Sequence, residues 1–460
     1  MSSHDVAESP QPGQSVEAPG GPAGAPKRWS APWVLPAAAA ALLLALGAES
    51  VRWLRDHDDA PIGRQERVLQ ASQPPLFRTV GVELPPGPDG GERRADPLFD
   101  NRNSAARGEA IGGREGTTRH AEAAVMAGLI CLAKAQEADG HWDCKRWDGG
   151  LGYDVAMTGL ALLAFQGAGY TQAKGRFKTT VGNALNWLAT AQKADGNFAW
   201  KTYYEQGMAT MAVCEAFGMT RAPEVGRVAQ AAIDAIRRIQ PAHGGFRYGG
   251  AVDEQGGDMS VTSWQIAAME TALAAGLKVP QEAIDRCRLF LKSTYRGDGG
   301  TAYLVSAKQA TPAMSAAGML IRQLLGGDYQ AEIEAGADRL RRYQQKEDRI
   351  GPRTGRDHLV GDLYYTYYST YAMFQMGGEH WAQWNKLFRD PLVKCQCHQR
   401  VDRRGEIVRG SWDPRNHQWG ARGGRVYATA MAILCLEVYY RYAPIKKPQP
   451  QPKVENLQQN

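Results

Sequence analysis

A run of tyrosines holds the densest side-chain chemistry in this sequence. Its members are Tyr364, Tyr365, Tyr367, Tyr368 and Tyr371, and at helical spacing they cover more than one face. Hydroxyl-tipped rings at the mouth of a cavity would hold an apolar or a cationic group, because the ring faces are apolar and electron-rich. The alternative is structural, with the rings packing a helix that is buried on all sides. Both interpretations can hold for different rings of the run.

A second stretch combines one carboxylate with hydroxyl groups and an indole. It reads Asp258-Met-Ser260-Val-Thr-Ser-Trp264. Asp258 has no carboxylate beside it, and a lone carboxylate lacks the neighbour that would tune it as a strong acid. Trp264 faces either a cavity or the neighbouring helix, and helix phase alone leaves both open.

The seven cysteines form no metal-binding pattern. Cys395-Gln-Cys397-His398 has no partner pair at metal-ligand spacing, so core cysteines beside a surface histidine are the favoured interpretation. Most of the others stand at apolar helix positions and are expected to be small core residues. They are Cys131, Cys214, Cys287 and Cys435.

A third group of side chains lies close to the C-terminus. His417, Trp419, Arg422 and Arg425 gather just before an apolar stretch. They could bind an anion, but a solvated polar loop is the favoured interpretation.

A recurring turn indicates which elements position these residues. It reads QEADGHW at 136–142, QKADGNF at 192–198, QPAHGGF at 240–246 and RGDGG at 296–300. Weaker copies follow at Gly351 and at GSW, 410–412. A repeat of roughly fifty residues is typical of a helical array. The Asp-Gly pair forms the turn, because glycine accepts a positive φ and aspartate bonds the neighbouring backbone.

Each repeat predicts a helical hairpin. The stretch before the turn has apolar residues three and four apart, and the stretch after it is richer in small apolar residues, as at 157–165. Six hairpins between residues 116 and 445 predict an all-α (α/α)6 toroid, with an open solenoid as the alternative. Closure is favoured because the last inner stretch, 426–440, is as apolar as the middle ones, whereas an open array normally ends in a polar cap.

Charge and length exclude some classes of function. The chain has 460 residues and a net charge of +6, with lysine and arginine spread throughout. This distribution, without any binding motif, argues against nucleic acid as a partner. No cofactor motif is found, and none is expected to be used.

The regions outside the array differ in composition. Residues 1–30, rich in Pro, Gly, Ser and Ala, are expected to be disordered, as is the Pro-rich tail at 446–460. Residues 31–50 include an uncharged apolar stretch just long enough for one transmembrane helix. A cleaved signal peptide is possible, although the segment before it is long for an n-region. Residues 51–115 are expected to be a linker.

The membrane topology follows only weakly from the sequence. Lys27 and Arg28 precede the apolar stretch, but more arginines follow it, and this balance leans against an exported C-terminal domain. An N-terminal anchor behind a short tail usually acts as an export signal. We therefore expect a single-pass membrane protein with the toroid on the exported side.

The repeated Gln-x-x-Asp-Gly-x-Trp turn resembles that of the squalene–hopene cyclase and protein prenyltransferase superfamily. The resemblance covers residues 117–445, and its motif is specific in the first two repeats and loose afterwards. It implies an (α/α)6 toroid, in agreement with the six hairpins counted above. Complement-type thioester domains have a related toroid, but their Cys-Gly-Glu-Gln motif is absent here.

The resemblance also shows where the family's catalytic motifs are missing. Hopene-type cyclases protonate their substrate with Asp-x-Asp-Asp-Thr-Ala, and the nearest segment here, Asp258 to Ser263, keeps one carboxylate. Prenyltransferases bind zinc through Asp, Cys and His, which align with Asp258, Ser260 and Tyr365. Serine and tyrosine are poor zinc ligands, so no metal is expected. These three side chains would instead form a hydrogen-bonding patch, with Asp258 and Tyr365 close together at one end of the ring.

The resulting hypothesis is a membrane-anchored toroid that binds an apolar ligand in its central cavity. The resemblance favours an isoprenoid or another lipid as that ligand. The candidate ligand-binding residues are Asp258, Ser260, Trp264, Tyr364, Tyr365 and Tyr368. Two alternatives remain: a cyclase or transferase with a rearranged site, and a toroid that binds another protein. A lumen plugged by side chains would favour the last.

Overall fold

The computed structural model describes residues 99, 102, 110–111, 116–249, 256–350, 361–402 and 404–441, without side chains for 346–350. Residues 1–98 and 442–460 lie outside this range, so the predicted tail, membrane helix and most of the linker stay predictions. Within the described residues no helix is both long and apolar enough to cross a membrane. The described part is all-α, and its only β pairs are isolated bridges.

Six helical hairpins form the described fold, each with one outer and one inner helix. The outer helices are α5 (Arg119–Ala135), α7 (Lys178–Ala191), α9 (Pro223–Ile239), α11 (Gln281–Thr294), α13 (Gln330–Ile350) and α16 (Gly378–Lys394). The inner helices are α6 (Asp154–Gly167), α8 (Tyr203–Thr220), α10 (Met259–Ala274), α12 (Pro312–Leu325), α15 (Leu363–Met376) and α17 (Gly420–Leu436). The 3-10 turn η1 (Pro414–Asn416) precedes α17, and α18 (Val438–Arg441) follows it.

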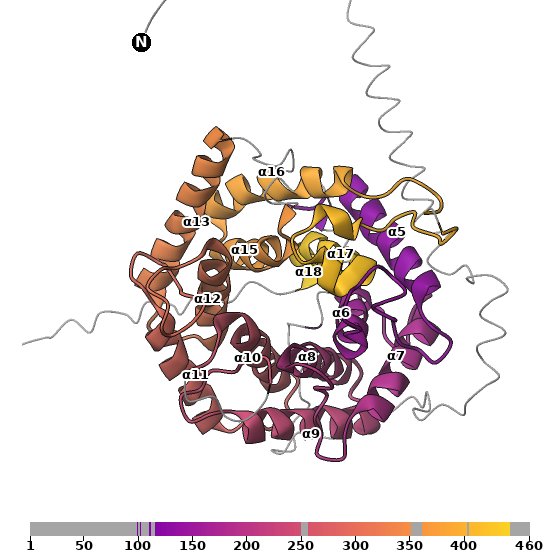
Figure 1. Cartoon of the computed structure of the whole chain (residues 1–460), viewed down its shortest axis with the longest axis horizontal. Helices are drawn as coiled ribbons and strands as arrows, with labels where there is room; N and C mark the ends of the chain where they lie inside the picture. Colours follow the sequence, from indigo (N-terminus) through magenta and orange to yellow (C-terminus); the bar gives the residue numbers. More distant parts are fainter. Residues whose placement is uncertain are drawn as a thin grey trace, which may run out of the picture. The chain divides into compact units, whose positions relative to one another are not determined.

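The hairpins close into one ring, as predicted. Each inner helix contacts the next, and α17 of the last hairpin returns to contact both α6 and α5 of the first. Viewed down its shortest axis, the structure shows the inner helices lining the centre and the outer helices surrounding them (Figure 1). The open-solenoid alternative is therefore excluded.

Sequence pattern explains which helices lie inside. In α10, for example, thirteen of the sixteen residues are buried, and polar members such as Ser263 bond back to their own helix. The outer α9 instead buries only its apolar stripe, which includes Val225, Ile233 and Ile236. Burial on all sides thus requires a helix without a polar face, as the sequence predicted for the inner set.

The turn glycines set the spacing between neighbouring hairpins. Gly140 has φ +104°, and a Cβ there would lie 2.3 Å from Asn183 O of the next outer helix. Gly410 has φ +89°, and its Cβ would lie 2.4 Å from Ala127 O. Ala127 belongs to α5, so the last turn packs on the first hairpin as the others pack on their successors. Only glycine satisfies both the positive φ and this close approach.

Glutamines fasten the first three turns and the last one to the neighbouring hairpin, whereas Arg296 occupies this position in the fourth turn. Gln136 Nε2 donates to Gly140 O at 2.8 Å within its turn and to Thr180 O at 2.9 Å in α7. At the end of the ring, Gln396 Nε2 donates to Gly410 O at 2.8 Å and to Ala124 O at 2.7 Å in α5. The same pair of glutamine hydrogen bonds therefore links the first and second hairpins and joins the last hairpin to the first.

The aromatic residue after the turn packs back on its own outer helix. Trp142 Nε1 donates to Leu132 O at 2.8 Å, and Trp412 Nε1 donates to Leu392 O at 2.8 Å. Both indoles are fully buried.

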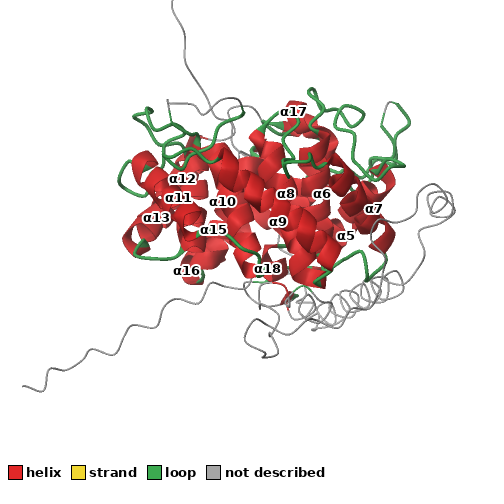
Figure 2. Cartoon of the chain, turned by 90° about the horizontal axis from the view of Figure 1, so that it is seen from below, coloured by secondary structure: helices red, strands yellow, loops and turns green. Residues whose placement is uncertain are grey.

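Long loops lead from the outer to the inner helices and lie at one end of the ring, which we call the loop face (Figure 2). All six inner helices begin at this face, and short connections join the hairpins at the opposite end.

A charged cluster is buried at the opposite end. Arg102 Nη1 lies 2.6 Å from Glu215 Oε2, and Arg441 Nη2 lies 2.5 Å from Glu215 Oε1. All three side chains are at most 1% exposed. Arg102 Nε also donates to Arg441 O at 3.0 Å. Arg102, which precedes the ring in sequence, and Arg441, at its end, thus both pair with α8 and contact each other.

Candidate functional site

The candidate site lies at the loop face, where Asp258 begins α10. Its Oδ1 accepts hydrogen bonds from Val261 N at 2.8 Å and from Ser260 Oγ at 2.7 Å. This is an ordinary N-cap arrangement for one oxygen. The second oxygen, Oδ2, is buried and has no hydrogen-bond partner among the described residues. Burial raises the pKa of Asp258, and the hydrogen bonds from Ser260 and Val261 only partly offset it.

Hydroxyl groups from two other inner helices converge on Ser260. Tyr204 OH, at the start of α8, donates to Ser260 Oγ at 2.6 Å. Tyr364 OH, at the start of α15, donates to Ser260 O at 3.0 Å. The first turn of α10 is therefore held between side chains of α8 and α15. Three of the predicted ligand-binding residues, Asp258, Ser260 and Tyr364, are brought together.

The tyrosine hydroxyls continue from Ser260 toward solvent. Tyr303, which precedes α12, is half-buried and lies beside Ser260. Its hydroxyl is 2.9 Å from that of Tyr248, which is 42% exposed. A chain of hydroxyl groups thus runs from the loop-face surface to the buried carboxyl of Asp258.

Aromatic rings fill the space below Asp258. Trp264 stacks on Tyr367 of α15, with centroids 5.5 Å apart, and meets Tyr368 edge-on at 6.0 Å. Tyr364 and Tyr368 are themselves in contact, with centroids 4.9 Å apart. In the toroid, α12 stands between α10 and α15. The aromatic side chains of α10 and α15 therefore meet across the inner face of α12. Trp264 and Tyr368, both predicted site residues, therefore belong to one aromatic cluster.

Tyr365 does not follow the arrangement expected from the sequence. Its ring packs edge-on against Tyr343 of α13 and Trp384 of α16, both on outer helices. It is Tyr364 that reaches the start of α10. The error is one of helix phase, because adjacent residues of a helix differ in direction by about 100°. A role for Tyr365 in ligand binding remains a prediction.

Two more buried polar groups near the cluster have no hydrogen-bond partner among the described residues. One is Trp264 Nε1, and the other is the hydroxyl of Tyr427 in α17. Tyr427 interacts electrostatically with Asp362 and Tyr368, so it adjoins the same cluster. Asp362, the N-cap of α15, accepts from Tyr365 N at 3.1 Å, and burial raises its pKa.

Sequence analysis missed three members of the site. Tyr204 lies at the start of α8, and Tyr248 and Tyr303 precede α10 and α12 in loops without a motif. The available signal was positional: each stands within the stretch that enters an inner helix, as Tyr364 and Tyr427 do.

The weaker candidates lie elsewhere on the loop face. Cys395 caps the end of α16, and Cys397 follows in the loop, so neither is in a helix core as expected. Arg425 is 6% exposed, and it donates to Ser411 Oγ at 3.0 Å. The expectation of a solvated loop is therefore wrong for Arg425. The described residues contain no group of three or more His, Cys, Asp or Glu side chains placed to hold a metal.

Comparisons with known proteins match the fold alone. No protein-family model and no curated protein match the chain. A variant of the type II terpene cyclase MstE from Scytonema, in complex with geranylgeranyl dihydroxybenzoate, matches with a TM-score of 0.46 and 13% identity over 70% of this chain and 97% of that one. An α-amylase from Clostridium perfringens matches with a TM-score of 0.49 and 9% identity over 69% of this chain and 98% of that one.

An α-1,6-mannanase from Salegentibacter gives a TM-score of 0.45 and 8% identity over 70% and 98%. The matches thus include a terpene cyclase, an α-amylase and a mannanase. At these scores no residue role is transferred from any of them, and the ring rests on the helix contacts described above.

Proposed function

We propose that the protein binds an apolar ligand carrying at least one oxygen, an isoprenoid or another lipid, at the loop-face end of its ring. The observation that carries this proposal is a set of three buried polar groups without a partner among the described residues: Asp258 Oδ2, Trp264 Nε1 and Tyr427 OH. Buried polar groups are normally hydrogen-bonded, and leaving one unmet costs ~1–3 kcal/mol. A ligand hydroxyl would relieve this cost, because it can donate to Asp258 Oδ2 and accept from an indole N–H or a phenol.

The surroundings of these groups support an apolar ligand. Tyr364, Tyr367 and Tyr368 are buried and packed on one another and on Trp264, so they form an aromatic base for the site, and the half-buried Tyr204 and Tyr303 border the approach from the surface. Aromatic surface with a few fixed polar groups is the usual composition of a small-molecule site. The close packing of Trp264 on Tyr367 means that the ligand would occupy the loop-face end of the lumen above these rings. A toroid that binds another protein remains the alternative, and the packing of these buried rings across the lumen is the observation that favours it.

Proton transfer to the ligand is a second candidate function. It is favoured by the raised pKa of Asp258, which keeps a larger share of the carboxyl protonated near neutral pH. The protonated carboxyl would present its proton on Oδ2, since Oδ1 already accepts two hydrogen bonds. Tyr248, Tyr303 and Ser260 would then return a proton from solvent to the carboxylate through Oδ1, the oxygen to which Ser260 donates. No metal or organic cofactor enters this scheme.

Native mass spectrometry of the full chain, extracted in mild detergent, tests the proposal. We expect an adduct in the mass range of an isoprenoid or lipid, reduced at least about tenfold by Trp264→Ala, which removes the indole N–H and its ring. Phe374→Ala, on α15 but at its far end, is the matched control and should keep the adduct. An adduct that survives Trp264→Ala, or no adduct even after incubation with a farnesyl or geranylgeranyl lipid, would contradict it.

A further inference from the structure

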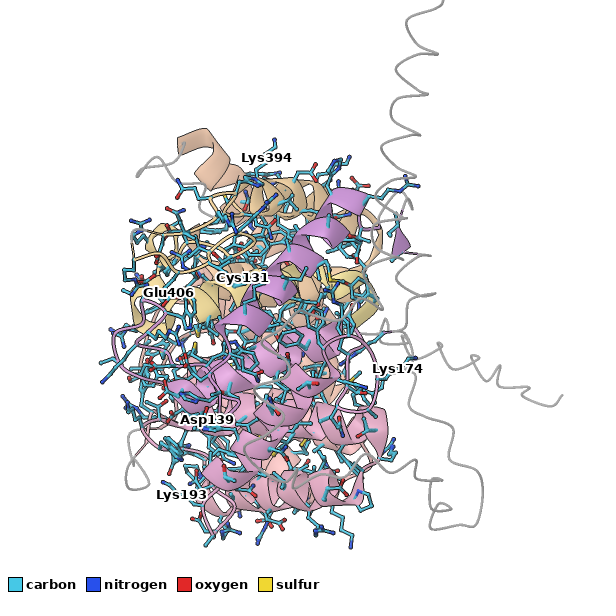
Figure 3. All side chains as sticks on the ribbon, turned by 90° about the vertical axis from the view of Figure 1, so that its right-hand side faces the viewer. Cys131, Asp139, Lys174, Lys193, Lys394 and Glu406 are labelled. Atoms are coloured by element: carbon cyan, nitrogen blue, oxygen red, sulfur yellow. The ribbon has the colours of Figure 1, made fainter. Side chains whose placement is uncertain are left out.

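Exposed apolar side chains gather at one end of the ring. Among the described residues, six of the eight exposed large hydrophobic side chains lie in loops of the loop face, whereas Leu273 and Leu289 lie on helices. The six are Leu151, Trp200, Tyr248, Val401, Ile407 and Trp419. Figure 3 shows the ring from the side, with Asp139 and Glu406 of two such loops toward the loop face and Lys174 at the opposite end. The loop face is therefore the end that offers apolar surface to a partner.

Two lysines flank Leu151 in the loop that enters α6. Lys201 Nζ donates to Leu151 O at 2.5 Å and to Gly152 O at 2.7 Å. A Cβ on Gly152 would lie 3.0 Å from Lys201 Nζ and 3.2 Å from Lys145 Cε. Leu151 and both lysine side chains are exposed. An apolar side chain and two ammonium groups thus share one short stretch of surface.

Trp419 and Arg422 of the last hairpin adjoin this stretch. Gly150 N donates to Ala421 O at 2.9 Å, so the start of α17 is docked on the loop that carries Leu151. The guanidinium group of Arg422 lies over the ring of Trp419, 5.7 Å from its centroid, and both side chains are exposed. We call this group the mouth patch, and its members are Lys145, Leu151, Lys201, Trp419 and Arg422.

The mouth patch carries positive charge that no carboxylate of the described chain neutralises by a salt bridge. The carboxylates nearest to Lys145 in sequence are already engaged. Asp143 Oδ1 accepts from the backbone N–H of Lys145, and Asp148 pairs with Arg404. Three unpaired cations therefore stand beside two exposed apolar side chains. Basic residues with tryptophan and leucine are the composition of a surface that lies on an anionic membrane.

The mouth patch also borders the surface end of the candidate site. Tyr153, the N-cap of α6, interacts electrostatically with both Arg422 and Tyr248. Tyr203 N, in the segment that carries Lys201, donates to Tyr248 O at 2.8 Å. Tyr248 is the exposed end of the chain of hydroxyl groups that leads to Asp258. A surface docked on the mouth patch would therefore face the entrance to the site.

We propose that the mouth patch docks the ring on the surface of an anionic lipid bilayer. Trp419 and Leu151 enter the headgroup region, where indole and aliphatic side chains are favoured, and the three cations lie over lipid phosphates. A bilayer suits this patch better than an acidic protein does, because cations alternate with its apolar members, whereas the core of a protein interface is depleted of charge. The docking does not depend on which ligand the ring binds.

Acetylation footprinting of the full chain tests this docking. The protein would be combined with lipid nanodiscs of phosphatidylcholine, alone or with phosphatidylserine, and the acetylation rate of each lysine measured by mass spectrometry. We expect Lys145 to react at least about fivefold more slowly with the anionic nanodiscs, because lipid phosphates and headgroups cover its ammonium group. Lys174 and Lys278, exposed on connections at the opposite end, should react equally with both.

Two double variants separate the mouth patch from net charge and general hydrophobicity. Trp419→Ala with Arg422→Gln removes one apolar and one cationic member, and it should abolish the protection of Lys145. Leu289→Ala with Arg227→Gln is the matched control, since it removes an exposed apolar and an exposed cationic side chain from outer helices. The control should keep the protection.

A third variant distinguishes docking from ligand binding. Trp264→Ala, which should remove the bound ligand, should leave Lys145 protected, so the two proposals fail separately. The docking proposal is overturned if Lys145 reacts equally with neutral and anionic nanodiscs, if Lys174 is protected instead, or if the protection survives Trp419→Ala with Arg422→Gln. Equal protection by soluble polyglutamate would overturn it in favour of an acidic protein partner.

Discussion

At the scale of single residues, Asp258 combines two roles that are usually separate. One oxygen caps α10 in the ordinary way, and the other is buried without a partner among the described residues. Capping explains why a carboxylate or amide stands there, but not why the second oxygen is left unmet. That unmet oxygen is what distinguishes Asp258 from a purely structural cap.

Replacement of Asp258 should change how stability depends on pH. Burial raises its pKa in the folded state above the value near 3.9 of an unfolded aspartate, so folding favours the protonated form. The resulting destabilisation is absent well below pH 3.9 and complete above the folded pKa. Asp258→Asn keeps the cap and removes the charge. We expect its Tm to exceed that of the wild type at pH 7.5, with the difference shrinking toward pH 3.5.

Asp413→Asn is the control with the opposite sign. Hydrogen bonding to Arg415 lowers the pKa of Asp413, so this carboxylate contributes stability above the unfolded pKa and loses it as pH falls through the folded pKa. The variant should melt below the wild type at pH 7.5 and approach it in acid. If Asp258→Asn also melted below the wild type at pH 7.5 and approached it in acid, the Asp258 carboxylate would be stabilised by a partner and not penalised by burial.

At the scale of elements, the glutamines and glycines of the first three turns and of the last one explain how those hairpins are joined. A buried amide that loses its hydrogen bonds leaves its carbonyl partners unmet. Gln396→Ala should therefore reduce the free energy of unfolding by ~1–3 kcal/mol in a denaturant titration. Gln383→Ala removes an exposed contact with Glu379 within α16 and should change it by less than ~0.5 kcal/mol. Equal effects would mean that the junction between the last and first hairpins does not depend on Gln396.

Two glycines of the same loop separate backbone strain from steric clash. Gly410 and Gly405 have φ of +89° and +81°, but only at Gly410 would a Cβ meet backbone, at Ala127 O. At Gly405 nothing lies within 4 Å. Gly405→Ala should cost ~1 kcal/mol from its φ alone, and Gly410→Ala should cost ~2 kcal/mol or more beyond that. Similar losses in two denaturant titrations would mean that the Gly410 contact is not tight.

The hairpins could be predicted from the sequence because glycine at a positive φ and a helical apolar period are local signals. Gln396 was missed because the last loop separates it from Gly410, whereas Gln136 stands close to Gly140. The expected patch placed Tyr365 beside Asp258 and Ser260, whereas Tyr364 reaches Ser260, and the reason is related. Both are apolar enough for a helix buried on all sides, so the sequence alone does not fix which one points inward.

At the scale of the whole molecule, the ring joins residues that are far apart in sequence. Glu215 pairs with both Arg102 and Arg441, away from solvent. A broken buried ion pair leaves an uncompensated charge, which typically costs ~3–5 kcal/mol. Arg102→Met should therefore destabilise the ring by a few kcal/mol in a denaturant titration. Arg404→Ala, in an exposed pair with Asp148, should cost less than ~1 kcal/mol. A mild effect of Arg102→Met would show that Arg102 contributes little to holding the chain before the first hairpin on α8.

The central claim is that the ligand occupies the loop-face end of the ring, and photolabelling tests it most directly. The full chain would be irradiated with a diazirine-bearing geranylgeranyl lipid, and the labelled residues mapped by mass spectrometry. We expect labels on Tyr204, Tyr303 or Tyr364, competed by unlabelled lipid and lost in Trp264→Ala. Labels confined to Trp187 of α7 and Trp200 of the following loop, whose rings contact each other, or labels that competitor does not reduce, would contradict the claim.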